Sequence, residues 1–177
     1  MPELPTPYVL RRAASEDEAF LLRLFVCAQE TYSLAGGEDA QLRQLLALQF
    51  RARNASYAAR YPQAECQLIC TPERTPVGRL LVCPGDETLH LIDIALLPAY
   101  RARGIGTCVL RDLQGACAQR GLAITLSALR EGRAQALYRR LGFLVTSEDA
   151  VYAQLEWRAP TRGEAPLPAN RSDTYTV

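Results

Sequence analysis

The sequence predicts a mixed α/β domain in which helices cover both faces of a sheet. Two observations carry this prediction. Short apolar segments with the two-residue period of strands alternate along the chain with segments that have the period of helices. The chain of 177 residues is also 49% hydrophobic and 22% charged, which suffices for one compact core and is short for two.

The first third of the chain predicts one strand and two helices. A short strand is expected over 8–11. Ser15 and Glu18 have the spacing of a capping box, which predicts a helix beginning at Ser15. The pair Gly36-Gly37 ends that helix, and a second helix is expected over 38–62. The apolar face of the second helix consists of Leu42, Leu45, Leu46 and Phe50.

Three apolar segments in the middle of the chain predict a meander of strands. They cover 65–71, 77–83 and 89–97. The connections at 72–76 and 84–86 contain proline, and the second also contains glycine and aspartate, which are typical turn residues.

Helices and strands alternate in the last part of the domain. Gly121 and Gly142 each follow a segment with helical period and suit the C-caps of two helices. The expected elements are a helix over 106–121, a strand over 122–129, a helix over 133–141 and a hairpin of strands over 143–146 and 151–157. The rest is rich in Pro, Arg, Ser and Thr, so we expect a single domain over 1–158 and a flexible tail over 159–177.

Composition and charge argue against several classes of function. The formal net charge is +1, which marks the surface neither for nucleic acid nor for a membrane. Six cysteines without a Cys-x-x-Cys pair, together with the single histidine His90, argue against a zinc site. No segment approaches the roughly 20 apolar residues of a membrane helix, and the N-terminus has no secretory pattern. We therefore expect a cytoplasmic protein that uses no metal.

Arginine and tyrosine are interleaved in the second predicted helix. Such interleaving can bind nucleic acid or an acidic partner. It is more often a solvated helix face whose aromatic rings pack inward, and the near-zero net charge favours this interpretation, so no nucleic-acid partner is expected. The residues are Arg51, Arg53, Tyr57, Arg60 and Tyr61.

The stretch PAYRARGIGTCVL joins the third strand of the meander to the helix over 106–121. A helix N-terminus presents unpaired N–H groups, and Gly104 and Gly106 let a bulky anion approach them. Arg101 and Arg103 add positive charge, so the stretch predicts a phosphate or pyrophosphate site. A Walker loop requires a lysine that the chain lacks, and a dinucleotide fingerprint requires glycine where Val109 stands. A simple helix start and a loop for another nucleotide remain alternatives.

Two motifs together resemble the GNAT superfamily of N-acetyltransferases. Ile94-Ala-Leu-Leu-Pro98 followed by Arg101-x-x-Gly104-x-Gly106 resembles its acyl-CoA binding signature. Ala134-Gln-Ala-Leu-Tyr138, followed by Leu141-Gly-Phe143, resembles its second signature. The resemblance covers about 8–157 and is specific over 92–143. It implies the GNAT acyl-CoA N-acyltransferase fold, with a twisted, mixed, mostly antiparallel sheet flanked by helices.

The resemblance also implies where acetyl-CoA binds. The backbone of Ile94, Ala95 and Leu96 would pair with the pantetheine arm. The loop and helix start would hold the pyrophosphate, and Ala134 matches the second signature. The implied loop residues are Arg101, Ala102, Arg103, Gly104, Ile105, Gly106 and Thr107.

Tyr138 matches the family tyrosine whose hydroxyl lies near the thioester sulfur. It would protonate the leaving thiolate as a general acid. The alternative for Tyr138 is ordinary helix packing beside Leu137 and Leu141. The sequence departs from the family at Glu131, where many members have an asparagine that contacts the cofactor, so Glu131 points to solvent or shapes the acceptor pocket.

His90 and Asp93 are the titratable groups in the third strand of the meander. Strand alternation predicts His90, Ile92 and Ile94 on one face and Asp93 on the other. His90 titrates near neutrality and is the candidate general base, with a hydrogen-bonded structural histidine as the alternative. Asp93 would bind a cationic substrate, act through water or pair with an arginine.

In the family the acceptor pocket is lined by the first two helices, their loop and the final hairpin. Glu30, Tyr32 and Glu38 flank Gly36-Gly37 here, and acidic residues would suit an amine substrate. A solvated loop is the alternative. Tyr152 lies in the predicted hairpin.

The sequence thus predicts an N-acetyltransferase that passes the acetyl group of acetyl-CoA directly to an amine of a small molecule or a protein. A longer acyl-CoA and a catalytically inactive CoA-binding regulatory module are the alternatives. A homodimer is a possible assembly, because family members often pair.

Overall fold

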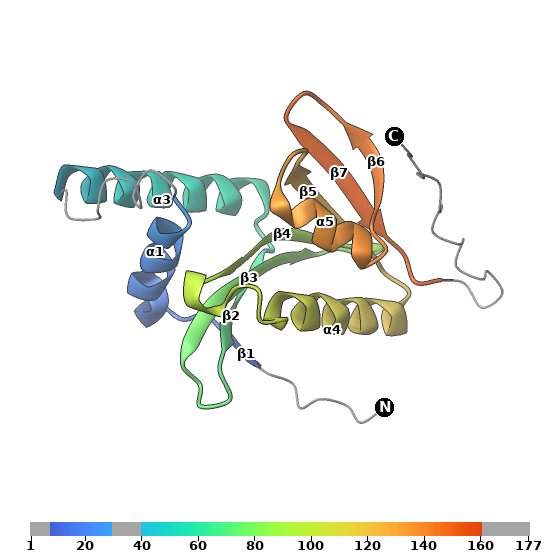
Figure 1. Cartoon of the computed structure of the whole chain (residues 1–177), viewed down its shortest axis with the longest axis horizontal. Coiled ribbons are helices and arrows are strands. Elements are labelled where there is room, and N and C mark those ends of the chain that lie inside the picture. Colours follow the sequence, from blue (N-terminus) through green and yellow to red (C-terminus); the bar gives the residue numbers. More distant parts are fainter. Residues whose placement is uncertain (1–7, 30–39, 161–177) are drawn as a thin grey trace, which may run out of the picture.

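The computed structural model describes residues 8–29 and 40–160, and its elements follow the expected order (Figure 1). The strands are β1 (Val9–Arg12), β2 (Glu65–Cys70), β3 (Pro76–Pro84), β4 (Thr88–Leu96), β5 (Ala123–Leu129), β6 (Leu144–Glu148) and β7 (Tyr152–Trp157). The helices are α1 (Glu18–Cys27), α3 (Ala40–Arg60), α4 (Ile105–Arg120) and α5 (Arg133–Arg140), with short 3-10 turns η1 (Ser15–Asp17) and η2 (Pro98–Tyr100).

The strands form one seven-stranded sheet in the order β1-β2-β3-β4-β5-β7-β6. Neighbouring strands are antiparallel except for β4 and β5, which are parallel. The parallel pair is connected through α4, because parallel neighbours need a long crossover. The predicted fold class, a mixed and mostly antiparallel sheet flanked by helices, is confirmed.

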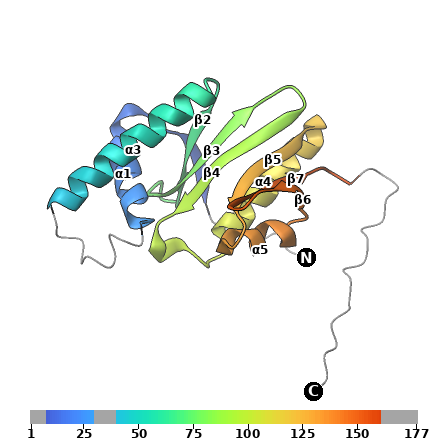
Figure 2. The ribbon, with the colours of Figure 1, turned by 90° about the horizontal axis from the view of Figure 1, so that it is seen from above.

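Helices lie on both faces of the sheet (Figure 2). The main core lies where α4 and α5 pack on one face, around buried side chains such as Val109, Leu110, Ile124 and Phe143. On the other face α1 and α3 share a separate small cluster of Phe25, Leu46 and Phe50. The helices α1 and α3 therefore pack against each other through their own apolar contacts. A cavity remains between α3 and the sheet.

The junction between β1 and α1 differs from the predicted capping box. Ser15 begins a 3-10 turn, and no side-chain hydrogen bond caps it. The Asp17 carboxylate instead accepts a hydrogen bond from the N–H of Ala14 at 2.8 Å and two from the Arg11 guanidinium at 2.7 Å each. These bonds, led by the Arg11 pair, lower the pKa of Asp17 to about 2. The predicted cap was wrong by one residue, because Ala14 is the N-cap residue and its N–H is bound by Asp17.

A β-bulge in β4 decides which side chains share a face. The register with β3 pairs Leu91 with Val82 and Asp93 with Leu81, so Ile92 has no partner residue. Before the bulge Leu89 and Leu91 face the α4 side, and after it Ile94 and Leu96 do so. One extra residue inverts the alternation. The expectation that His90 and Asp93 lie on opposite faces was wrong, because both are on the α3 side.

Candidate active site

The strands β4 and β5 separate halfway along their length. They pair only from Thr88 to Leu91 on β4 and from Ala123 to Leu126 on β5. Beyond that point the β4 segment 92–96 has no strand on its β5 side. The separated strands leave a cavity of about 250 Å³ between them. Its lining includes Ile92, Asp93, Ile94, Ser127, Ala134 and Tyr138.

The loop after β4 leaves a row of backbone donors free. Among the described residues, none of the N–H groups from Ala102 to Thr107 has a hydrogen-bond partner, and the first helical bond of α4 runs from the Cys108 N–H to the Gly104 carbonyl. Ala102 and Gly104 both have left-handed backbone, with φ of 57° and 83°. A series of free N–H groups at a helix start is a site for an anion the size of a phosphate.

The loop arginines have different positions. Arg101 is exposed and donates from its Nε to the Leu96 carbonyl at 2.9 Å, which fixes the loop against the end of β4. Arg103 is exposed and its guanidinium lies 5.5 Å from the ring centre of Tyr100. Glu131 is exposed and lines a separate cavity with Arg130 and Val151.

Tyr138 is buried on α5 and lines the cavity between β4 and β5. Its ring packs edge-on against Phe143, with ring centres 5.6 Å apart. Among the described residues its hydroxyl has no hydrogen-bond partner. Burial, with a smaller contribution from the negative charge of Asp93, raises the pKa of Tyr138 to about 12. The phenol therefore keeps its proton at neutral pH.

His90 lies on the opposite face of the sheet, against the end of α3. Its Nε2 is 3.1 Å from the Tyr61 hydroxyl and its Nδ1 is 3.0 Å from the Thr125 Oγ1. The Tyr61 ring stacks on the imidazole, with centres 5.2 Å apart. Burial and the positive charge of Arg60 lower the pKa of His90. The imidazole is therefore neutral at pH 7, and both ring nitrogens have a hydroxyl partner.

Asp93 pairs with Arg79 of β3, which donates a hydrogen bond from its Nη2 to the carboxylate. The Arg79 side chain is 5% exposed and that of Asp93 is 24% exposed. Among the roles considered for Asp93, the structure records a pairing with arginine.

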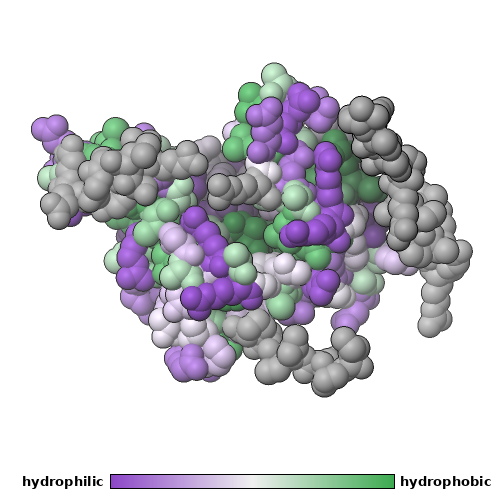
Figure 3. Space-filling view, in the orientation of Figure 1, coloured by the Kyte–Doolittle hydropathy of each residue, from purple (hydrophilic) through white to green (hydrophobic). Residues whose placement is uncertain are grey.

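A second cavity of about 410 Å³ opens on the α3 side of the sheet. It shares Leu91, Ile92 and Ser127 with the cavity on the other side. The two cavities therefore meet where β4 and β5 separate, and the space-filling view shows apolar surface in the middle of the molecule in this region (Figure 3). The remaining lining of the second cavity includes Tyr57, Arg60, Tyr61, His90, Tyr152 and Gln154.

Several site residues were not singled out by the sequence analysis. Arg79, Thr125 and Ser127 come from strands predicted only as core, and Tyr57 and Tyr61 were treated as inward-packed aromatics. A lone arginine inside the apolar segment 77–83 was the one available signal. Glu30, Tyr32 and Glu38 lie outside the described residues.

Two features are absent from the described residues. Within residues 8–29 and 40–160, no three His, Cys, Asp or Glu side chains come together as metal ligands would. In the same ranges every helix is too short or too polar to cross a bilayer.

Comparison with known proteins identifies the family. The model of the GNAT acetyltransferase family matches residues 29–143, which is more than half of the chain. The chain belongs to the GNAT acetyltransferase family. None of the curated proteins matches the sequence.

Solved structures share the fold at low sequence identity. PaiA N-acetyltransferase from Thermoplasma acidophilum, in complex with coenzyme A, is 15% identical with a TM-score of 0.64, and the match covers 86% of this chain and 99% of that one. An acetyltransferase from Thermus thermophilus is 16% identical with a TM-score of 0.62, covering 86% and 97%. A GCN5-related N-acetyltransferase from Rhodopseudomonas palustris is 19% identical with a TM-score of 0.62, covering 88% and 98%.

Proposed function

We propose that this protein transfers the acetyl group of acetyl-CoA directly to an amine in a ternary complex. The observation that carries the proposal is the opening between β4 and β5. It has free backbone N–H groups at one end and the protonated Tyr138 hydroxyl along its wall. The GNAT family consists of acyl-CoA acyltransferases, which supports the same reaction.

Acetyl-CoA would bind on the α4 side of the sheet. The N–H groups of 102–107 would hold the pyrophosphate, and Arg101 and Arg103 add positive charge at the loop. The unpaired β4 segment 92–96 would form hydrogen bonds with the pantetheine amides as a missing strand would. The thioester would then lie between Ile92 and Tyr138.

The acceptor amine would enter from the cavity on the α3 side and meet the thioester where the two cavities join. Its nitrogen attacks the thioester carbon, and a backbone N–H of the unpaired β4 segment stabilises the oxyanion. The carbon–sulfur bond then breaks, and the thiolate takes the proton of the Tyr138 hydroxyl.

The proton released by the amine needs a base on the acceptor side. We propose His90, whose Nε2 faces the Tyr61 hydroxyl in the acceptor cavity. Tyr61 would accept the amine proton while passing its own proton to Nε2. The Nδ1–H of His90 would donate a hydrogen bond to the Thr125 hydroxyl, which holds the tautomer whose Nε2 is free to act as the base.

The test combines binding and turnover. Calorimetric titration with acetyl-CoA, CoA and ATP in parallel should show binding of the two CoA species and none of ATP. Release of free CoA thiol in the presence of a panel of amines should then exceed release without amine. Binding of CoA without amine-dependent release under any condition would identify a CoA-binding module instead of an enzyme. Preferential binding of ATP would overturn the acyl-CoA assignment.

A further inference from the structure

Three charged side chains lie close enough to affect one another electrostatically on the α3 side of the sheet, next to the acceptor cavity. They are Arg53 of α3, Arg79 of β3 and Asp93 of β4. Arg79 uses its Nη2 to bind Asp93. The Nε atoms of Arg79 and of Arg53 are buried and have no hydrogen-bond partner among the described residues. Two buried donors are therefore available here.

The charges of this cluster do not balance. Two guanidinium groups and one carboxylate leave one positive charge, because arginine stays protonated in proteins. The Arg53 guanidinium lies 4.4 Å from the ring centre of Phe25 and 5.7 Å from that of Tyr57, so its described neighbours there are aromatic rings. Burial and the positive charge of Arg79 lower the pKa of Arg53, and the smaller effect of the Asp93 carboxylate opposes them. An anion would compensate this excess positive charge.

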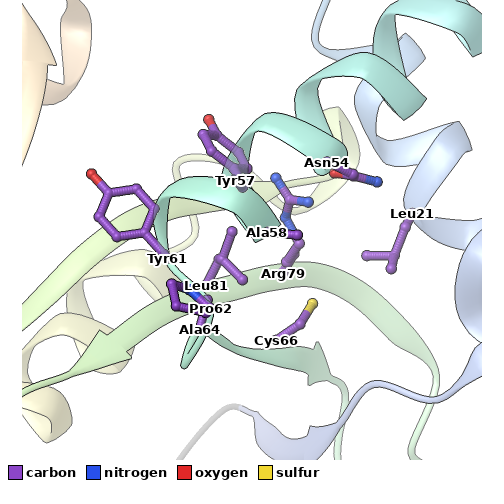
Figure 4. A pocket seen from close by; sticks show the side chains of 10 residues that line it. All are labelled: Leu21, Asn54, Tyr57, Ala58, Tyr61, Pro62, Ala64, Cys66, Arg79 and Leu81. Atoms are coloured by element: carbon purple, nitrogen blue, oxygen red, sulfur yellow. The ribbon is translucent and has the colours of Figure 1, made fainter.

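A cavity of about 290 Å³ lies between α3 and the strands β2 and β3, and Arg79 projects into it from the sheet (Figure 4). Its walls are mostly apolar, with Leu21 of α1 on the far side and Leu81 beside Arg79. Tyr57 and Tyr61 line both this cavity and the acceptor cavity. The two cavities therefore adjoin along the inner side of α3.

We propose that the acceptor is an amine that also carries a carboxylate, and that this carboxylate binds to Arg79 in the cavity beneath α3, with the positive charge of Arg53 beside it. The proposal rests on the proposed acetyl transfer. A carboxylate is a monoanion and matches one uncompensated positive charge, whereas a phosphate with close to two charges would leave the cluster negative. The planar guanidinium groups also match a carboxylate in shape.

The position of Asp93 limits the distance between the amine and the carboxylate. Asp93 holds the Arg79 guanidinium, and it directly follows Ile92, where the acceptor cavity meets the thioester side. One to three strand residues correspond to roughly 3 to 10 Å. The acceptor class is therefore an amino acid or short peptide in which a few bonds separate the amine from the carboxylate.

The turnover test uses pairs of acceptors in which a neutral amide replaces the carboxylate. A series of amino acids with increasing spacing between amine and carboxylate is compared with the corresponding amino amides, and kcat/KM is measured from CoA release. We expect at least one spacing at which the acid is preferred over its amide by about tenfold or more, since that factor corresponds to one charge-assisted hydrogen bond. Equal use of acids and amides would overturn the proposal and leave acetyl transfer standing.

The variant Arg53→Met keeps an unbranched apolar stem and removes the guanidinium and its charge. It should reduce the acid-over-amide preference about tenfold. The preference is compared between variant and wild type because the intrinsic reactivity of each amine cancels in this ratio. The matched control is Arg51→Met, an exposed arginine on the same helix, which should keep the wild-type preference. Arg79→Met is a poorer test, because it leaves Asp93 without its partner and is expected to lower the stability of the fold. An unchanged preference in Arg53→Met would contradict the proposal.

A binding measurement separates this site from the chemistry. The N-acetylated form of the preferred amino acid is titrated calorimetrically into the CoA-bound protein, beside its neutral amide. Tighter binding of the anion in the wild type and in Arg51→Met, lost in Arg53→Met, supports the anion site even where turnover is slow. Equal binding of anion and amide overturns it. Failure of acetyl-CoA itself to bind would remove the proposed function, and with it the acceptor assignment.

Discussion

The two faces of the sheet are built differently at the point where β4 and β5 separate. On the α4 side the candidate acyl-CoA site consists mainly of backbone groups, the free N–H groups of 102–107 and the unpaired segment 92–96. On the α3 side the cavities are lined by side chains from α1, α3 and five strands. The site on the α4 side is formed by a short stretch of chain, whereas the cavities on the α3 side combine residues that are distant in sequence.

This difference separates what a family shares from what one member recognises. Backbone donors at a helix start bind a phosphate largely independently of the identity of the surrounding side chains. Side chains such as Arg60, Tyr61 and His90 determine the charge and shape of the proposed acceptor cavity. We therefore expect changes on the α4 side to abolish the use of acetyl-CoA, and changes on the α3 side to alter which acceptor is used.

The largest effect is expected from Gly104→Glu. The substitution puts a negative charge beside the free N–H groups, at a left-handed position that a side chain tolerates poorly. Affinity for acetyl-CoA should fall by more than about 100-fold, a loss of about 2.7 kcal/mol, measured by calorimetry. The control is Gly115→Glu on the exposed surface of α4, where an added side chain also meets open space. A folded Gly104→Glu protein with wild-type affinity would sink the pyrophosphate assignment.

Tyr138→Phe should come next. Loss of a general acid lowers turnover by roughly 10² to 10⁴-fold, while CoA affinity should change little because the ring remains. Since the pKa of Tyr138 is raised to about 12, the wild-type turnover number should show no loss through ionisation of this group between about pH 7 and 10. Steady-state kinetics across that range would check both points, and a full-speed variant would exclude Tyr138 from catalysis.

Asp93→Ala distinguishes a structural ion pair from a substrate ligand. It leaves the buried Arg79 without its anion, so we expect a loss of about 3 kcal/mol in the free energy of unfolding. The double variant Asp93→Ala/Arg79→Met should lose less than the sum of the two single variants. Urea unfolding of all three proteins measures this. A fully stable Asp93→Ala that fails only in acceptor binding would favour the substrate role.

A smaller effect is expected from His90→Gln. The amide keeps hydrogen-bonding capacity toward Tyr61 and Thr125 but is not a base. We therefore expect kcat/KM to fall roughly 10 to 100-fold. This loss is at or below the usual effect of removing a general base, because water can take the proton instead. A base works in its neutral form, and burial lowers the pKa of His90 below 6.5. Wild-type activity should therefore persist at pH 7 and decline only below pH 6.5.

The decline below pH 6.5 supplies the decisive comparison for His90. It should be absent or weaker in His90→Gln at any pH where both proteins remain folded. The same decline in both would assign His90 a structural role, held between Tyr61 and Thr125.

Local patterns predicted most of the fold. The order of helices and strands along the chain, the C-cap at Gly121 and the helix that starts beside Gly104 each depend on a few neighbouring residues. The bulge at Ile92 did not follow from the sequence, because a one-residue offset depends on how two strands pair and leaves the apolar pattern nearly unchanged. The capping box at Ser15 was wrong by one residue, since Ala14 is the N-cap residue and Asp17, which Arg11 of β1 also binds, accepts its N–H.

The sequence by itself determined the class of fold, the two GNAT signatures and the loop of free N–H groups, because these depend on short-range spacing. Only the tertiary structure decided that His90 and Asp93 share a face, and that Arg53, Arg79 and Asp93 form one cluster. The physical reason is that side chains from α3, β3 and β4 meet through strand register and layer packing. Neither is encoded within a single stretch of chain.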